Sequence, residues 1–155
     1  MFAKGLVAGA AGTAALDLYS YGDIVVRGRA PSELPSSVVS KIAARFGRTS
    51  FANTDDAVTK HRRSGLGALF GYGVGLGAGV VYAKLRPEFE SWLPWPVAGV
   101  ILAAATLVAS EGSATALGAT DWRTWSPSDW IADIIPRTLY GLTTAWVVEA
   151  FGDPL

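Results

Sequence analysis

Four stretches of the chain are long, apolar and poor in charge. The clearest covers residues 64–83, where no side chain carries a formal charge. At about 1.5 Å per residue, a helix of this length crosses the ~30 Å hydrocarbon core of a bilayer. Residues 5–26, 96–118 and 130–151 have the same character, with a few ionisable side chains inside. The pattern predicts one all-α membrane domain over residues 1–155, with four transmembrane helices.

Glycine recurs at every fourth position of the second apolar stretch. In water, each glycine would weaken a helix by roughly 1 kcal/mol relative to alanine. In lipid the helix is obligatory, because no water is present to bond the backbone, and small residues at this spacing let a neighbouring helix come close. The spacing predicts a helix-packing face, a glycine zipper, formed by Gly67, Gly71, Gly75 and Gly79. The first stretch has a similar face at Gly5, Gly9 and Thr13.

The positive residues indicate how these helices are oriented, since cytoplasmic connections retain Lys and Arg. Most of them lie in the loop 27–63 between the first and second spans, and Arg123 lies between the third and fourth. Only Lys4, Lys84 and Arg86 lie on the opposite side. We therefore expect a multi-pass protein whose two termini face outward and whose loop 27–63 is cytoplasmic.

The loop 27–63 contains a basic amphipathic segment. After Pro35, Ser36 or Ser37 can cap a short helix that Gly47 can end. Its apolar face comprises Val38, Val39, Ile42, Ala43 and Phe46. One role for this helix is to lie on the anionic inner leaflet or to dock on a partner; the other is to cover the ends of its own bundle. The residues expected to make the outer contact are Lys41, Arg45, Phe46 and Arg48.

Three ionisable residues lie inside the predicted spans at similar depth. Counted along the helices, Asp17 and Glu111 lie roughly 18 Å and 22 Å below the outer ends, and Arg137 lies roughly 20 Å below the outer face. Charges in a bilayer are costly unless they are paired, so we predict a buried cluster in which Arg137 bridges both carboxylates. The cluster either fixes helix register or, with one carboxylate in excess, binds a proton or a cation.

A weak two-plus-two repeat runs through the chain. Val7-Ala8-Gly9 followed by Asp17 resembles Val97-Ala98-Gly99 followed by Glu111. The distance to the acidic residue differs between the two halves. The resemblance predicts two related pairs of helices.

The remaining chemistry argues against an enzyme. Gly73, Gly75 and Ala78 match a relaxed dinucleotide fingerprint, but a basic segment precedes them where that fingerprint requires a strand. With no cysteine and a single histidine, thiolate and histidine-rich metal sites are excluded. A net charge of zero provides no field that would attract nucleic acid. We expect no catalytic residue, no metal and no cofactor.

Five short segments resemble the YagU-type family of small bacterial inner-membrane proteins. They are GLVAGAAGTAALD at 5–17, RAP at 29–31, HRRSGLGALFGYG at 61–73, LRP at 85–87 and DIIPRTLYG at 133–141. The chain departs from the family pattern at Arg137, which stands where a histidine precedes the Tyr-Gly pair. The resemblance implies four helices in the bacterial inner membrane, and it implies no particular reaction.

Two functions fit these features. The first is a non-enzymatic accessory or stabilising subunit of a larger inner-membrane assembly, such as a lipid-import transporter, because the glycine faces exceed what four helices need. The bias toward Ala, Gly, Val and Arg is typical of a GC-rich bacterium such as an actinobacterium. The alternative is a small proton- or cation-coupled carrier or channel that uses the acidic cluster as a homo-oligomer. In both cases the expected partners are the lipid bilayer and other membrane-protein subunits, not nucleic acid.

Overall fold

The computed structural model describes residues 1–152, and over this range the chain is helical and contains no strand. This confirms the all-α prediction. The helices are α1 (Phe2–Arg27), α2 (Leu34–Arg45), α3 (Thr49–Asn53), α4 (Ala57–Leu85), α5 (Trp95–Ala116) and α6 (Pro127–Ala150). Two short 3-10 turns, η1 (Arg86–Glu88) and η2 (Trp122–Thr124), follow α4 and precede α6.

Two helical segments are long and apolar enough to cross a membrane, Ala57–Phe89 and Trp95–Ala116. They correspond to the second and third predicted spans. Helices α1 and α6 have 26 and 24 residues and are not among these two segments; each has charged side chains in its middle as well as near its ends. Helix α4 begins several residues before the second predicted span, residues 64–83. Asp56 caps its start by accepting a hydrogen bond from the Thr59 amide at 2.9 Å. The hydrogen bonds from Thr59 hold the pKa of the Asp56 carboxyl below its usual range.

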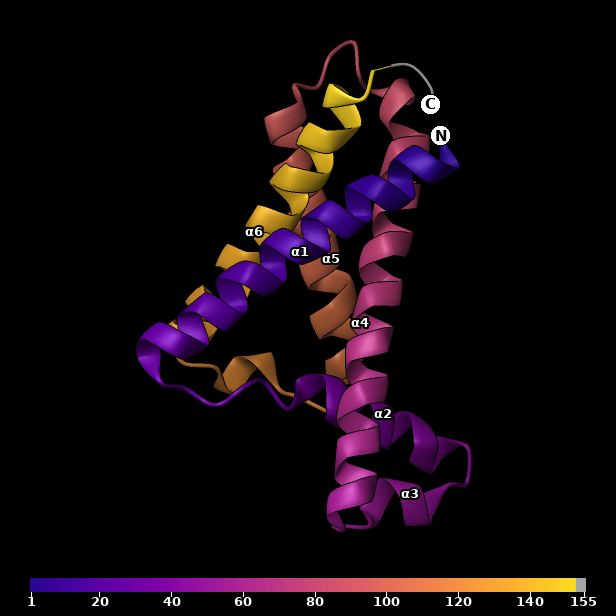
Figure 1. Cartoon of the computed structure of the whole chain (residues 1–155), viewed down its shortest axis with the longest axis vertical. Coiled ribbons are helices and arrows are strands. Elements are labelled where there is room, and N and C mark those ends of the chain that lie inside the picture. Colours follow the sequence, from indigo (N-terminus) through magenta and orange to yellow (C-terminus); the bar gives the residue numbers. More distant parts are fainter. Residues whose placement is uncertain (153–155) are drawn as a thin grey trace.

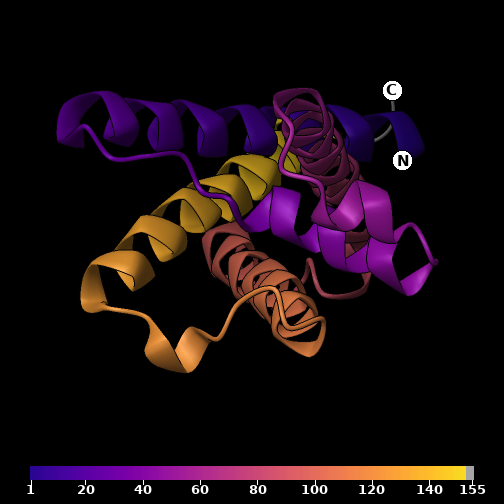
Figure 2. The same cartoon turned by 90° about the horizontal axis from the view of Figure 1, so that it is seen from below.

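The four long helices are packed in the order α4, α1, α6, α5 (Figure 1). Helix α1 contacts both α4 and α6, and α6 contacts α5. The start of α1 and the end of α6 lie at one end of the molecule, where the helices converge, while α1 and α4 separate toward the other end (Figure 1). At that second end α2 packs on α4, and α3 packs on α2 (Figure 2).

Helices α1 and α4 cross with almost no side-chain atoms between their backbones. A Cβ added to Gly5 would lie 2.5 Å from the Cα of Val80, and one added to Gly79 would lie 2.6 Å from the Cα of Gly9. Both distances are shorter than a real Cβ contact, so only glycine fits without a backbone shift. The predicted small-residue faces of the first and second stretches therefore meet each other.

The crossing of α5 and α6 repeats this geometry. A Cβ on Gly99 would lie 3.0 Å from the Gly141 carbonyl oxygen and 3.1 Å from the Leu142 Cα. In the α1–α4 pair, a Cβ on Gly9 would meet the equivalent atoms, which are the Gly75 carbonyl oxygen at 2.7 Å and the Leu76 Cα at 2.9 Å.

The first helix of each pair, α1 or α5, also ends in the same way. Gly28 follows α1 with a φ of 62°, and Gly118 follows α5 with a φ of 70°. Both glycines stand at the same distance along the chain from Gly9 and Gly99 respectively. The equivalent crossings and the equivalent left-handed glycines agree with the predicted two-plus-two repeat.

The four glycines of the predicted packing face do not all contact the same helix. Gly75 and Gly79 face α1, whereas Gly67 packs on Pro35 of α2, at 2.7 Å from its carbonyl carbon to an added Cβ. Gly71 has no neighbouring atom within 4 Å of an added Cβ, so no other helix of this chain packs on it. The reason is that a four-residue step rotates by about 40° on an α-helix. Over three steps the stripe therefore turns from one neighbour to another.

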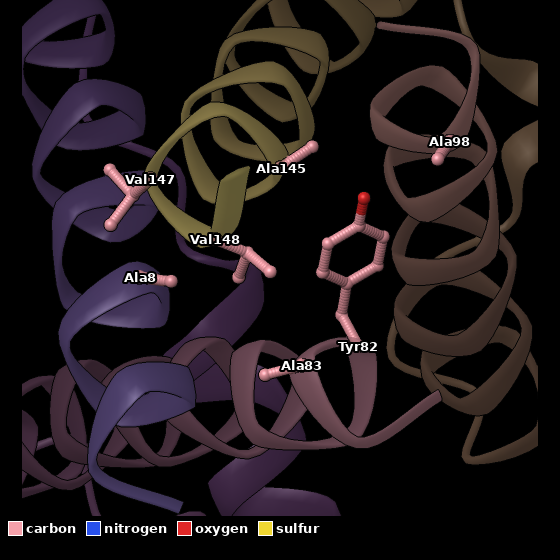
Figure 3. Close-up of a cluster of buried hydrophobic side chains, with 7 residues drawn as sticks. All are labelled: Ala8, Tyr82, Ala83, Ala98, Ala145, Val147 and Val148. Atoms are coloured by element: carbon pink, nitrogen blue, oxygen red, sulfur yellow. The ribbon is translucent and has the colours of Figure 1, made fainter. Parts of the chain in front are cut away.

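The core is made of small residues at the convergent end. It comprises Ala8, Tyr82, Ala83, Ala98, Ala145, Val147 and Val148 (Figure 3). Tyr82 is the largest of these, and its ring lies between α6 and α5 (Figure 3). Bulky apolar residues are instead found outside: Leu69 is 69% exposed and Val108 is 70% exposed.

The glycine crossing can be tested by replacing Gly79 with Leu. The larger side chain must separate the α1 and α4 backbones, so we expect the free energy of unfolding in detergent micelles to fall by about 1–3 kcal/mol or more. Gly71→Leu is the matched control, because nothing packs on Gly71. Equal stability of the two variants would show that α1 and α4 do not cross at Gly79.

Candidate functional site

The site with the most polar chemistry inside the helices lies between α5 and α6. Arg137 forks between two carboxylates: its Nη2 lies 2.6 Å from Glu111 Oε1, and its Nε donates to Asp133 Oδ2 at 2.9 Å. Asp133 stands one helical turn before Arg137 on α6, while Glu111 belongs to α5. The guanidinium therefore joins the two helices of the second pair.

In this cluster Glu111 is buried and Arg137 and Asp133 are half-buried, and it contains one carboxylate more than it has basic groups. Glu111 is 5% exposed, and its Oε2 has no hydrogen-bond partner. Ser110 Oγ lies 3.4 Å from both Arg137 Nη2 and Glu111 Oε1. With all three groups ionised, the cluster of Glu111, Asp133 and Arg137 has a formal charge of −1. A hydrogen-bond donor or a cation at Glu111 Oε2 would complete it.

Asp17, the third predicted member, is absent from this cluster. It forms no salt bridge with Arg137, and Asp17 Oδ2 instead accepts a hydrogen bond from Tyr72 Oη of α4 at 2.8 Å. Asp17 continues the four-residue stripe of Gly5, Gly9 and Thr13, which faces α4. Equal depth was therefore the wrong criterion for Asp17, because the side of the helix decides the partner. Asp133 occupies the place beside Arg137 that was predicted for Asp17.

A second polar contact lies where α1, α4 and α6 meet. Tyr140 Oη donates to the carbonyl oxygen of Gly75 at 2.6 Å, and both Tyr140 and Thr144 are buried. An added Cβ on Gly12 would overlap the Thr144 hydroxyl and the Tyr140 ring, so these two side chains of α6 pack directly on the backbone of α1. The sequence analysis did not assign Tyr140 or Thr144 to a site. Their four-residue spacing on α6 was the available signal.

A buried ion pair closes the convergent end of the molecule. Arg86 is 5% exposed, and its Nε lies 2.5 Å from Glu149 Oε1. Its Nη1 donates to the Leu93 carbonyl at 2.9 Å, and its guanidinium lies 5.4 Å from the centre of the Phe89 ring. This pair connects the end of α4 to the end of α6. Its position in the sequence predicts only a loop charge for Arg86.

Another buried arginine organises the opposite end. The Arg63 guanidinium donates to the carbonyls of Phe51, Ala52 and Thr54, which belong to the end of α3 and the residue after it. Since the last carbonyls of a helix have no partners within it, this side chain caps α3 and holds it against α4. Sequence reasoning missed this contact because α3 itself was not predicted.

The predicted amphipathic helix is present, with two corrections. It begins at Leu34 with Glu33 at the N-cap position, so neither Ser36 nor Ser37 caps it. Helix α2 ends at Arg45, so Phe46 lies beyond it and does not share its apolar face. Phe46 is 81% exposed, and Lys41, Arg45 and Arg48 are exposed as well. Arg45 Nη2 donates to the carbonyl of Ala116, the last residue of α5, at 3.4 Å. Arg45 therefore joins the helix to the bundle of this chain and stays exposed, as Lys41 and Arg48 do.

Within residues 1–152, no group of three or more His, Cys, Asp or Glu side chains is arranged to hold a metal ion. Comparison of the chain with protein-family models, with curated proteins and with solved structures gives no match. The resemblance to the YagU-type family thus remains a prediction from its short motifs.

Coupling between Arg137 and Glu111 can be measured with a double-mutant cycle. Arg137→Ala leaves two carboxylates without a basic partner and should cost about 3–5 kcal/mol of unfolding free energy. Adding Glu111→Gln should restore part of that loss, with a coupling energy of about 0.5–3 kcal/mol in equilibrium unfolding. The control pair is Arg137→Ala with Asp17→Asn, whose effects should add within about 0.5 kcal/mol. Additivity in both cycles would contradict the cluster.

Proposed function

We propose that this protein is a four-span protein of the bacterial inner membrane and serves as a non-enzymatic accessory subunit of a larger membrane assembly. The distribution of side-chain size supports the membrane part. The interior is built from Ala, Gly and Val, while large apolar side chains such as Leu18, Leu69 and Val108 point outward. In water such a surface would be unfavourable, whereas lipid solvates it.

The charges of α1 and α6 support their assignment as the first and fourth spans. In α6, Arg137 is paired with Glu111 and Asp133, and Glu149 is paired with Arg86. In α1, Asp23 near the inner end pairs with Arg27 and Arg29, and Asp17 accepts a hydrogen bond from Tyr72. Ionisable groups inside a membrane are tolerated when they are paired or lie near the ends of a helix.

The observation that carries the accessory role is an unused glycine pair on α4. An added Cβ at Gly73 or Gly77 would meet no atom within 4 Å, and these residues stand four apart on the helix. Exposed Leu66, Phe70 and Val81 flank them on the same side. Glycine gains nothing from contact with lipid chains, but a small-residue pair lets another transmembrane helix approach closely. The partner in this proposal is therefore a helix of another subunit.

One observation favours a second candidate, a small proton- or cation-coupled carrier or channel. The buried Glu111 Oε2 has no partner, and the cluster with Asp133 and Arg137 has excess negative charge. This candidate requires Glu111→Gln to abolish a cation or pH gradient-dependent flux in vesicles that contain the protein alone. The accessory role requires no such flux.

The four-span topology predicts which positions a reagent outside the cell can reach. The chain has no cysteine, so single thiols can be introduced at Ala3 and at Ser50. In intact spheroplasts, an impermeant maleimide should label Ala3→Cys and spare Ser50→Cys, because positive loops remain inside. Both positions should react after the membrane is opened. Labelling of Ser50→Cys alone in intact cells would reverse the orientation.

The accessory role predicts a loss of partner without a loss of fold. After crosslinking in native membranes and purification, quantitative mass spectrometry should find a membrane protein with the wild type that is depleted in Gly73→Leu and Gly77→Leu. Gly71→Leu is the control, because it adds the same side chain outside this face. Recovery of only this chain would identify a homo-oligomer, and unchanged partners in both variants would contradict the assignment of the face.

A further inference from the structure

The two helix pairs differ mainly in the segment that joins their helices. Residues 28–56 connect α1 to α4 and contain α2 and α3, whereas only residues 117–126 connect α5 to α6. The glycine crossings of the two pairs are nevertheless equivalent. The longer connection is therefore not needed to make the helices cross, and its residues are available for another role.

The middle of this connection, between Glu33 and Asp55, carries only positive charges. Residues 34–54 contain Lys41, Arg45 and Arg48 and no acidic residue. All three side chains are exposed, and within residues 1–152 none of them forms a salt bridge. Phe46 lies among them with 81% of its surface exposed. Three exposed cations and one exposed aromatic ring within residues 41–48 combine the two features that attract a peripheral segment to an anionic membrane surface.

The structure also places this patch at a defined height. Pro35 at the start of α2 lies against Gly67 of α4, and Arg45 at its end reaches the carbonyl of Ala116, where α5 ends. Arg63 holds α3 on the same side, so the connection is fixed at both ends of α2. Seen along the molecule, α2 lies between the ends of α4 and α5 (Figure 2). The patch thus stands level with the inner end of a helix apolar enough to cross the membrane.

We infer that Lys41, Arg45, Phe46 and Arg48 form a docking surface for the headgroups of anionic phospholipids of the inner leaflet. The three cations bind the phosphates, and the Phe46 ring enters the boundary between headgroups and acyl chains. This inference rests on the proposed placement of α4 and α5 in the membrane. A protein partner would need a broader apolar contact than one phenylalanine provides, because charged residues are depleted from the cores of protein interfaces.

The test uses the absence of native cysteines. A single thiol at Ala44, which is exposed beside the patch, carries an environment-sensitive nitrobenzoxadiazole dye. The protein is reconstituted into vesicles of phosphatidylcholine alone or of phosphatidylcholine with phosphatidylglycerol. The dye should be brighter and blue-shifted in the anionic vesicles, and 1 M salt should remove the difference, because the Debye length is then about 3 Å.

Two charge variants decide whether the patch itself is responsible. The triple variant Lys41→Gln, Arg45→Gln, Arg48→Gln should lose the response to phosphatidylglycerol. The matched control Lys60→Gln, Arg62→Gln, Arg123→Gln removes the same charge from other exposed residues of the same side and should keep it. Loss in both variants, or in neither, would overturn the inference. If the triple variant still responds to phosphatidylglycerol, these three cations do not bind the lipid headgroups.

A second dye position separates this inference from the proposed function. A thiol at Leu69, which is 69% exposed on α4, should place the dye in hydrocarbon in both kinds of vesicle. An aqueous signal at Leu69 would refute the membrane placement. A hydrocarbon signal at Leu69 together with no anionic response at Ala44 would refute the lipid-docking surface alone.

Discussion

The close approach of helix backbones is the constraint on which the rest of this structure depends. At the α1–α4 and α5–α6 crossings, the space between the helices is so small that a Cβ at Gly5, Gly79 or Gly141 would collide with backbone atoms. Because the helices touch there, the adjoining core has room only for alanine and valine and for the ring of Tyr82. Of the larger apolar side chains, Phe89, Leu93, Trp95 and Leu102 pack on the edge of this core, and many others project from the outer surfaces. Dispersion contacts between closely packed backbones, rather than burial of bulky side chains, hold these helices together.

Glycine contacts bring the helices close together, and the buried charges fix how each helix is rotated toward its neighbours. Arg86 with Glu149 connects α4 and α6 at the convergent end, Arg137 with Glu111 connects α5 and α6, and Arg63 fixes α3 at the opposite end. Each arginine presents several donors in a fixed plane, so its partners must stand at defined positions. Rotating one of the helices would leave a buried charge unpaired, which is far more costly than losing a nonpolar contact.

The sequence predicted the helices better than it predicted their neighbours. The apolar stretches gave the position of all four long helices, because hydrophobicity and length depend on the sequence alone. Partners depend in addition on the side of the helix and on its tilt. Asp17 was assigned to Arg137 by depth, although it shares a stripe with Gly5 and Gly9 and so faces α4.

The stripe pattern could have supplied the correct partner. Asp133, Arg137 and Gly141 stand four residues apart on α6, and Glu111 continues the stripe of Gly99 and Ala103 on α5. No such signal existed for Arg63, whose acceptors are backbone carbonyls. Any sequence offers carbonyls, so a side chain that binds them leaves no pattern of matching residue types.

The equivalent helix crossings have a consequence for how such a chain can arise. Helices α1 and α5 both run away from the end where the chain starts, and α4 and α6 both return to it (Figure 1). A unit of two helices begins and ends on the same side of a membrane. Joining two such units head to tail therefore keeps the sidedness of each copy, and neither copy has to be inverted. Tandem duplication of a single ancestral helix pair, followed by growth of the first connection, is sufficient to produce this architecture.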